Sequence, residues 1–183
     1  NHIKTDLNNK EDIDFLFDTI YSQGDLDILI NSAAINYTKK FEEISNEEWN
    51  NVISINLNSI FYASRIALKK MKVRKSGKIV NISSIAGRHR SYVSGAHYVA
   101  SKAGIIGLTK QLAYELGKYN ININAVCPSQ TLTDMLHDSM TEDELKNLCK
   151  NIPLDRIASI QDQVGPIMFL CSDAASYITG TFL

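Results

Sequence analysis

The chain of 183 residues lacks several features that would place it in a specialised class of protein. Its three cysteines, Cys127, Cys149 and Cys171, form no CxxC pair, and its four histidines form no HxxxH or HExxH pattern. We therefore expect no metal site and no disulfide framework, and a reducing, cytoplasmic location. No apolar run approaches the roughly eighteen residues that span a bilayer. A formal net charge of −1 predicts neither a nucleic acid nor a membrane as a partner.

Glycine is also scarce where a nucleotide-binding protein needs it. The first glycine is Gly24, and Gly104-x-x-Gly107 falls within an expected helix, so the chain has no glycine-rich phosphate turn. The chain starts at Asn1, without a methionine or a visible signal peptide, and stops at Leu183 in what reads as the start of a strand. We expect that it is part of a longer polypeptide. A genuine truncation is the alternative, and it would leave the first strand with an unpaired edge.

Helical and strand patterns alternate along the chain without repeats or low-complexity segments. Strands that lack strict polar alternation and are separated by helices indicate a parallel sheet covered on both faces. The expected strands cover residues 26–31, 78–83 and 121–127. The expected helices cover residues 9–23, 45–72, 96–118 and 161–171, and one more begins after Thr141 in a Thr-x-x-Glu capping box.

Two details of this outline can be tested against a structure. The helix over residues 9–23 ends at Gly24, and its inward face is predicted to hold Phe15, Leu16, Thr19 and Ile20. The polar segment from Pro128 to Pro153 is a candidate mobile lid. A helical insertion without mobility is the alternative.

Small or polar residues follow each of the three strands. The first strand runs into Asn31-Ser-Ala-Ala34, the second into Ser83-Ser84 and the third into Cys127-Pro-Ser129. In open parallel sheets, ligands bind in the crevice beyond the carboxyl ends of the strands. Loops are commonly polar, so one strand end means little, but three neighbouring ends indicate one shared site.

Tyr98 and Lys102 are the strongest catalytic candidates. Residues four apart on a helix share one face, so a phenol and an ammonium can point into one cleft. A free tyrosine titrates near ~10, and a neighbouring cation lowers that pKa toward the range useful in acid–base catalysis. Ser84 adds a hydroxyl that can hold a substrate oxygen. A Tyr-x3-Lys pair taken alone is more often a packed tyrosine with a solvated lysine.

Asn56 interrupts the apolar stripe of the helix over residues 45–72. A buried amide must find hydrogen-bond partners or destabilise the fold. Those partners are either a backbone carbonyl of a neighbouring strand or, if the helix bends there, a bound water.

The helix over residues 96–118 is apolar on two sides. Ile105, Leu112 and Leu116 continue the Tyr98 face, and another face holds Val99, Ala103, Ile106 and Ala113. A helix with two buried faces packs on its own sheet and on something else. Small residues such as Ser101 and Gly104 allow a close approach. We predict a subunit interface here, with burial beneath another helix of the same chain as the alternative.

Together these motifs resemble the short-chain dehydrogenase/reductase family, in its compact branch of 3-oxoacyl-acyl-carrier-protein reductases and sugar or alcohol dehydrogenases. The resemblance runs from Thr5-Asp6-Leu7 to the end of the chain. Tyr98-x3-Lys102, Ser84 and Asn56 resemble the catalytic tetrad of that family. The other matching motifs are Asn124-Ala-Val-Cys-Pro128 with Thr133 and Asp134, Pro153-Leu-x-Arg-Ile157 and Tyr177-Ile-Thr-Gly180.

The resemblance implies an oxidoreductase that moves hydride between NAD or NADP and a carbonyl or alcohol. Tyr98 would pass the proton to or from the substrate oxygen, Lys102 would lower its pKa and bind the nicotinamide ribose, and Ser84 would polarise the carbonyl. Asn56 would hold a water that links Lys102 to solvent. The implied cofactor-binding residues are Asp6 and Leu7 at the adenine, Ser32 and Ala33 along the adenosine, Thr131 and Thr133 at the nicotinamide amide, and Tyr98 and Lys102.

The same resemblance implies a three-layer doubly wound parallel sheet, Rossmann-like, in a single domain over residues 1–183 that is incomplete at its N-terminus. The family's opening strand, glycine turn, helix and second strand do not precede Asn1. Those parts bind pyrophosphate and select NAD or NADP. The implied assembly is a homo-oligomer, a dimer or a homotetramer. The implied substrate is a small carbonyl, alcohol or acyl thioester.

Three positions depart from the family pattern. Ser32 and Ala34 replace an asparagine and a glycine, which is tolerated if the φ of Ala34 is negative. Ser129 replaces a glycine and slightly reshapes the nicotinamide pocket.

Arg88 and Arg90 lie in the loop before Tyr98 and could receive an anionic group of the substrate, although a solvated basic loop is the simpler interpretation.

Two other functions stay open on the sequence. One is a cofactor-less relic that acts as an oligomeric interaction module. The other is a sugar-nucleotide epimerase or dehydratase, which also uses Tyr-x3-Lys but needs a large C-terminal substrate domain. The motif Tyr177–Gly180 so close to the end of the chain disfavours it.

Overall fold

The computed structural model describes residues 2–137 and 140–183 and contains one parallel sheet. Its strands are β1 (Ile28–Asn31), β2 (Gly77–Ile82) and β3 (Ile121–Val126), in that spatial order. The helices are α1 (Lys10–Gln23), α2 (Asn46–Ile53), α3 (Ser59–Arg74), α4 (Ala96–Leu116), α5 (Asp134–His137), α6 (Glu142–Cys149) and α7 (Ile160–Cys171). All three predicted strands are present, with boundaries that differ by one or two residues.

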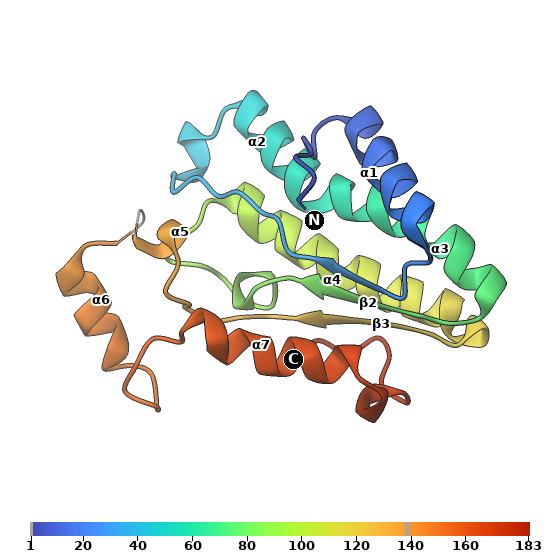
Figure 1. Cartoon of the computed structure of the whole chain (residues 1–183). Coiled ribbons are helices and arrows are strands. Elements are labelled where there is room, and N and C mark those ends of the chain that lie inside the picture. Colours follow the sequence, from blue (N-terminus) through green and yellow to red (C-terminus); the bar gives the residue numbers. More distant parts are fainter. Residues whose placement is uncertain (1, 138–139) are drawn as a thin grey trace.

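Helices cover both faces of this sheet, as the sequence predicts (Figure 1). α1 to α4 lie on one side, where α3 packs on β1 and β2 and α4 packs mainly on β3. α7 lies on the other side against β2 and β3. The three-layer α/β arrangement is therefore confirmed. No helix in the described ranges is both long and apolar enough to cross a membrane.

The inward face of α1 differs from the prediction. Ile13 and Phe17 are buried and pack against the α3 residues Ala67 and Met71, whereas Phe15 is 64% exposed. The helix holds apolar residues on more than one side, and the sequence does not say which side meets α3. Asn9 caps α1 by accepting from Glu11 N, and Gly24 ends it with φ of 148°.

The long helix predicted over residues 45–72 forms as a continuous helix with one local defect. Ser45 opens α2 with a capping box to Glu48. A π-helical turn over Ser54–Asn58 then leads into α3. Such turns insert one extra residue and rotate the side chains that follow. Asn56 lies in the middle of this turn and is fully buried.

The chain end forms a further parallel contact with β3. Ala125 N donates to Thr181 O at 2.9 Å, and Leu183 N donates to Ala125 O at 3.1 Å. The predicted start of a strand at residues 181–183 is thus confirmed as a bridge between Phe182 and Ala125. At the opposite side of the sheet, β1 is the edge strand.

The segment from Pro128 to Pro153 contains α5 and α6. Thr141 caps α6 with the predicted capping box, accepting from Glu144 N. The helical content agrees with the insertion alternative. Residues 138 and 139 of the proposed lid lie outside the described residues, and its mobility stays a prediction.

Candidate active site

Tyr98 and Lys102 lie in the first two turns of α4, where they face the same cavity. The Lys102 side chain is almost fully buried, and its Nζ donates to the Ile82 carbonyl at the end of β2 at 2.8 Å. The same Nζ lies 5.5 Å from the centroid of the Tyr98 ring. The i, i+4 spacing therefore brings the phenol and the cation together, as predicted.

Close packing fixes α4 against the end of β2. Gly87 belongs to η3, a 3₁₀ turn over Ile85–Gly87, and a Cβ on it would lie 2.6 Å from the carbonyl carbon and oxygen of Lys102. Ser83 Oγ also donates to Lys102 O at 2.8 Å. The backbone at Lys102 is thus held directly against the turn that follows β2.

Ser84 starts this turn and reaches the same cavity. Its Oγ accepts from Ala86 N at 3.1 Å. A hydrogen bond from the Ser84 hydroxyl to the Tyr98 side chain lowers the pKa of the phenol, although burial has the larger effect and raises it. Ser84, Tyr98 and Lys102 are therefore neighbours, which is the arrangement that the motif predicts.

The electrostatic prediction for Tyr98 differs from what the structure shows. Burial raises the pKa of Tyr98 above its ordinary value, because a phenolate is poorly solvated there. Burial likewise lowers the pKa of Lys102 to about 8. The expected lowering of the phenol pKa by the lysine is not found, because burial has the largest effect and the hydrogen bond from Ser84, not the charge of Lys102, opposes it.

Asn56 is satisfied by protein groups. Its Oδ1 accepts from Ile35 N at 2.8 Å, and its Nδ2 donates to Ile35 O at 2.9 Å. Nδ2 also donates to Ser101 Oγ at 3.1 Å. The prediction that Asn56 bonds to a backbone carbonyl is thus confirmed. The carbonyl belongs to Ile35 in the loop after β1, and not to a strand. The π-turn agrees with the other alternative, a local change in the helix.

A chain of amides joins the strand ends to α4. Asn31 Nδ2 donates to Asn81 Oδ1 at 2.8 Å, and Asn81 Nδ2 donates to Thr109 Oγ1 at 3.0 Å. The first of these bonds is partly buried and links the carboxyl ends of β1 and β2, and the second is buried. The expected shared floor at the strand ends is therefore present.

A cavity of about 550 Å³ opens above these strand ends. Among the predicted site residues, those that line it are Ser32, Ser84, Tyr98, Lys102, Thr131 and Thr133. Ala33 and Asn56 are not in its lining, although Ala33 stands between the lining residues Ser32 and Ala34. Thr131 also accepts a hydrogen bond from Gln163 Nε2 at 3.2 Å, which ties the cavity to α7.

The structure does not bring Asp6 and Leu7 to this cavity. Asp6 is exposed, and its carboxylate accepts from Asn8 N at 2.9 Å. Leu7 is partly buried against the core around Ile13 and Phe17. The adenine-binding role predicted for these two residues stays a prediction, at a position separate from the catalytic cavity.

One wall of the cavity is apolar and was not predicted. It is built from η3, α5 and α7, and its side chains include Ile85, Met135, Leu136, Ile160, Val164 and Ile167. Among the described lining residues there is no carboxylate, whereas Arg90 and Lys102 contribute positive charge. The sequence predicts a helix over residues 161–171, but the direction of its side chains toward the cavity depends on the fold.

The departures in the first loop are compatible with this geometry. Among the described residues, positive φ angles outside glycine occur only at Lys75, Asn120 and Asp155. Ala34 therefore has a negative φ, so the loss of glycine there is tolerated. Arg90 donates to the Tyr92 hydroxyl, and the Arg88 guanidinium lies 5.3 Å from the centroid of the Phe182 ring.

Within the described part of the chain, no group of histidine, cysteine and acidic residues could hold a metal ion.

Comparison with known proteins decides the family. A family profile described as enoyl-(acyl carrier protein) reductase matches residues 1–183. Acetoacetyl-CoA reductase from Acinetobacter sp. is 40% identical over 99% of this chain and 73% of its own length. The 3-oxoacyl-(acyl-carrier-protein) reductase FabG from Aquifex aeolicus is 39% identical over 97% of this chain and 71% of its own length. The chain belongs to the short-chain dehydrogenase/reductase family.

Solved structures of this short-chain dehydrogenase/reductase fold carry nicotinamide cofactors. ElxO with NADP bound superimposes with a TM-score of 0.91 at 30% identity, over 99% of this chain and 74% of that chain. A 3-oxoacyl-(acyl-carrier protein) reductase from Brucella melitensis with bound NAD gives a TM-score of 0.88 at 29% identity, over 99% and 68%. This chain is accordingly an NAD- or NADP-dependent oxidoreductase acting between carbonyl and alcohol. The alternative of a cofactor-less interaction module finds no support among these relatives.

The residues at the cavity fit the nicotinamide half of such a cofactor. Lys102 Nζ makes one described hydrogen bond, to Ile82 O, and an ammonium carries three donors. The hydroxyls of Thr131 and Thr133 line the same space, without a carboxylate that would repel phosphate. A bound cofactor supplies the hydride, and the protein supplies position and electrostatics.

Proposed function

We propose that this short-chain dehydrogenase/reductase interconverts a carbonyl and an alcohol with Tyr98 as the group that exchanges a proton with the substrate oxygen. The observation that carries the proposal is the meeting of Tyr98, Ser84 and Lys102 at one cavity over the strand ends. Ser84 holds and polarises the substrate oxygen, and Lys102 binds the nicotinamide ribose. In the reducing direction the raised pKa of Tyr98 keeps the phenol protonated and ready to donate.

Asn56 has a supporting part in this proposal. Both N–H donors of its amide are used by Ile35 O and Ser101 Oγ, and its Oδ1 accepts from Ile35 N, so it orders the loop after β1 and the Tyr98 helix. One lone pair of Oδ1 is left for a water. A water between Asn56 and Lys102 belongs to the same proposal. Ser32, Ala33, Thr131 and Thr133 remain the proposed contacts of the cofactor, and Asp6 with Leu7 its adenine end.

We propose a 3-oxoacyl thioester as the substrate class. The apolar wall, which includes Ile85, Ile160 and Val164, suits an acyl chain. The cavity lining includes Arg90 and, among its described residues, no acidic side chain, which suits the anionic carrier of such a thioester. The two relatives named above are called acetoacetyl-CoA reductase and 3-oxoacyl-(acyl-carrier-protein) reductase, so their names specify substrates of the same class for those proteins.

A substrate panel tests this choice. NADPH or NADH oxidation is followed with acetoacetyl-CoA, a longer 3-oxoacyl thioester, a ketosteroid and a keto sugar at equal concentrations. We expect the thioesters to be preferred, and Val164→Asp to reduce kcat/KM for the longer thioester by about tenfold or more, because it places a charge against the acyl chain. Preference for the sugar would refute the thioester class while leaving the oxidoreductase assignment intact.

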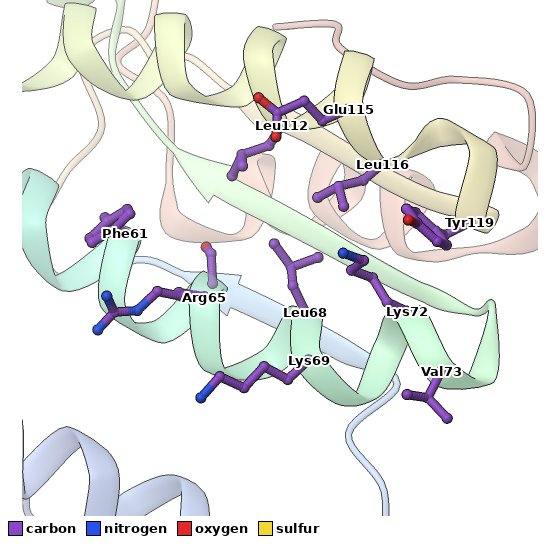
Figure 2. A pocket seen from close by; sticks show the side chains of 11 residues that line it. Phe61, Arg65, Leu68, Lys69, Lys72, Val73, Leu112, Glu115, Leu116 and Tyr119 are labelled. Atoms are coloured by element: carbon purple, nitrogen blue, oxygen red, sulfur yellow. The ribbon is translucent and has the colours of Figure 1, made fainter.

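We further propose that the chain forms a homo-oligomer through α3 and α4, a dimer that could pair again into a tetramer. A groove of about 650 Å³ runs between these helices, and Figure 2 shows its side chains projecting from both. The residues that line it are Phe61, Ser64, Arg65, Leu68, Lys69, Lys72, Val73, Leu112, Glu115, Leu116 and Tyr119.

Exposed apolar groups support a second copy as the occupant. Phe61 is 45% exposed and Val73 is 84% exposed, and Tyr114 on α4 is 87% exposed. Large exposed apolar residues that cluster on one face commonly mark an interface. The α3 side is basic and α4 carries Glu115, so a two-fold arrangement can bring opposite charges together.

Light scattering after size exclusion tests this assembly. Phe61→Arg should convert the oligomer to a monomer, because it replaces an exposed apolar ring at one end of the groove with a charge (Figure 2). Phe15→Arg is the matched control, since Phe15 is 64% exposed on α1 and should leave the mass unchanged. A monomeric wild-type protein would contradict the proposal.

We also propose a cytoplasmic location. The basis is that Cys127, Cys149 and Cys171 are free thiols, as is usual in a reducing compartment.

A further inference from the structure

His97 lies directly before Tyr98 in the first turn of α4 and is fully buried. The Tyr98 backbone N–H is shared between two acceptors, His97 Nδ1 at 2.8 Å and the Gly95 carbonyl at 3.1 Å. An imidazole that accepts through Nδ1 is neutral and carries its proton on Nε2. In the described part of the chain this Nε2 has no hydrogen-bond partner. A buried polar atom without a partner is destabilising, so stability alone does not explain the imidazole.

The surroundings of His97 are shaped to hold this ring. A Cβ on Gly95 would lie 2.5 Å from His97 Cε1 and 2.8 Å from Tyr37 O. Gly95 N donates to Tyr37 O at 3.2 Å, which fixes the approach to the helix. The Tyr37 ring packs on the imidazole at a centroid distance of 5.8 Å and an interplanar angle of 59°.

The carbonyl of Tyr98 is also held by buried side chains. Ser101 Oγ donates to Tyr98 O at 2.7 Å, and Asn56 Nδ2 donates to Ser101 Oγ at 3.1 Å. His97, Ser101 and Asn56 are each fully buried. Both backbone polar groups of Tyr98 therefore have a side-chain partner, His97 on the nitrogen side and Ser101 on the oxygen side.

We propose that His97 is a positioning residue for Tyr98. Its neutral imidazole holds the Tyr98 amide and thereby directs the phenol toward Ser84 and the substrate oxygen. This inference rests on the proposed function, in which Tyr98 exchanges the proton. Precise placement of a catalytic group is worth large factors in rate, so loss of the acceptor should lower kcat more than it raises KM.

Protonation of the ring removes this support. The charged and titratable groups near His97 are Glu48 on α2, Lys39 and Tyr37 in the segment before it, and Tyr98 on α4. Burial has the largest effect and lowers the pKa of His97. The charge of Glu48 and a hydrogen bond with the Gly95 backbone oppose this, and the charge of Lys39 adds to the lowering. The ring is therefore neutral at pH 7. Below its lowered pKa, Nδ1 becomes a donor that faces the Tyr98 N–H, so activity falls on the acid side.

Two variants separate positioning from packing. His97→Asn retains an acceptor oxygen near the position of Nδ1 but cannot be protonated. His97→Leu retains apolar bulk but has no acceptor. At neutral pH we expect His97→Asn to keep kcat within about threefold of the wild type and His97→Leu to lose about tenfold or more, with KM changed less than about threefold in both. On the acid side, His97→Asn should retain activity where the wild type declines.

A wild-type kcat in His97→Leu would overturn the proposal, as would an acid-side decline in His97→Asn that matches the wild type. If His97→Leu does not fold, ¹⁵N NMR of the wild-type protein still decides the question. The His97 nitrogens should report protonation at Nε2 only, and the Tyr98 amide signal should move as the ring titrates. Protonation at Nδ1 in the native protein would refute the proposal. These signals do not depend on turnover, whereas an active Tyr98→Phe variant would refute the proposed function itself.

Discussion

The side-chain amide of Asn56 forms a reciprocal pair with the backbone of Ile35, accepting at 2.8 Å and donating at 2.9 Å. A neighbouring strand would bond to the backbone N–H and carbonyl of Ile35 in the same way. Here one side chain in a π-helical turn makes both bonds. The pair holds the loop after β1 against the helix that precedes α3. The same Nδ2 reaches Ser101 and so connects the loop to the Tyr98 helix.

Replacing Asn56 should destabilise the protein strongly. Asn56→Ala leaves the partly buried backbone N–H and carbonyl of Ile35 without their Asn56 partners, and an unsatisfied buried group costs about 1–3 kcal/mol. We expect the free energy of unfolding to fall by about 2–4 kcal/mol in urea denaturation. Asn58→Ala is the control, because Asn58 is exposed in the same turn and should change stability little. Equal midpoints for the two variants would contradict the role given to Asn56.

Gly87 should not accept a side chain. In Gly87→Ala the new Cβ would lie 2.6 Å from the Lys102 carbonyl, so η3 and α4 must separate. We expect a loss of about 1–3 kcal/mol in stability together with lower activity. Gly107→Ala on α4 is the matched control, because nothing lies within 4 Å of its Cβ position. It should gain up to about 1 kcal/mol through helix propensity, measured by thermal unfolding.

Lys102 should give the protein a basic pH limit. Burial lowers its pKa to about 8, so the ammonium is present below that pH and is lost above it. We expect kcat/KM for the nicotinamide cofactor to fall as pH rises through about 8. The Lys102→Met variant should have a low kcat/KM that does not decline further over this pH range. The folded state releases this proton before the unfolded state does, so stability rises from pH 8 toward the ordinary lysine pKa. A wild-type profile that stays flat to pH 10 would refute this assignment.

Replacing Phe17 should destabilise the protein far more than replacing Phe15, although both residues lie on α1. Phe17 is 2% exposed and Phe15 is 64% exposed. Phe17→Ala should cost about 3–5 kcal/mol through lost burial and a cavity, and Phe15→Ala should stay within about 0.5 kcal/mol of the wild type. Chemical denaturation of both variants measures the difference. A larger loss of stability in Phe15→Ala than in Phe17→Ala would support the inward face that the sequence predicts, with Phe15 in the core.

Local patterns in the sequence were enough to predict much of this molecule. Capping boxes at Ser45 and Thr141 and apolar runs between them locate helices and strands, since these signals act within a few residues. The i, i+4 pair of Tyr98 and Lys102 also follows from helix geometry alone. Ser84 could be added because polar residues after parallel strands meet at one edge.

Other features depend on contacts between distant segments. The inward face of α1 is set by α3, so Phe17 and Phe15 could not be told apart from periodicity alone. The pKa of Tyr98 depends on how deeply the phenol is buried, which spacing does not reveal. The partner of Asn56 is the backbone of Ile35, and a backbone group leaves no mark in the sequence. His97 was missed because one histidine among apolar residues resembles an ordinary core residue.

The most direct test of the account is the steady-state kinetics of Tyr98→Phe with NADPH, NADH and acetoacetyl-CoA. The variant keeps the aromatic ring and loses only the hydroxyl that exchanges the proton. We expect kcat to fall by about 10²–10⁴, the range of general acid–base catalysis, while the Kd of the cofactor, measured by fluorescence, changes less than about threefold. A Tyr98→Phe enzyme that turns over at the wild-type rate would contradict the account.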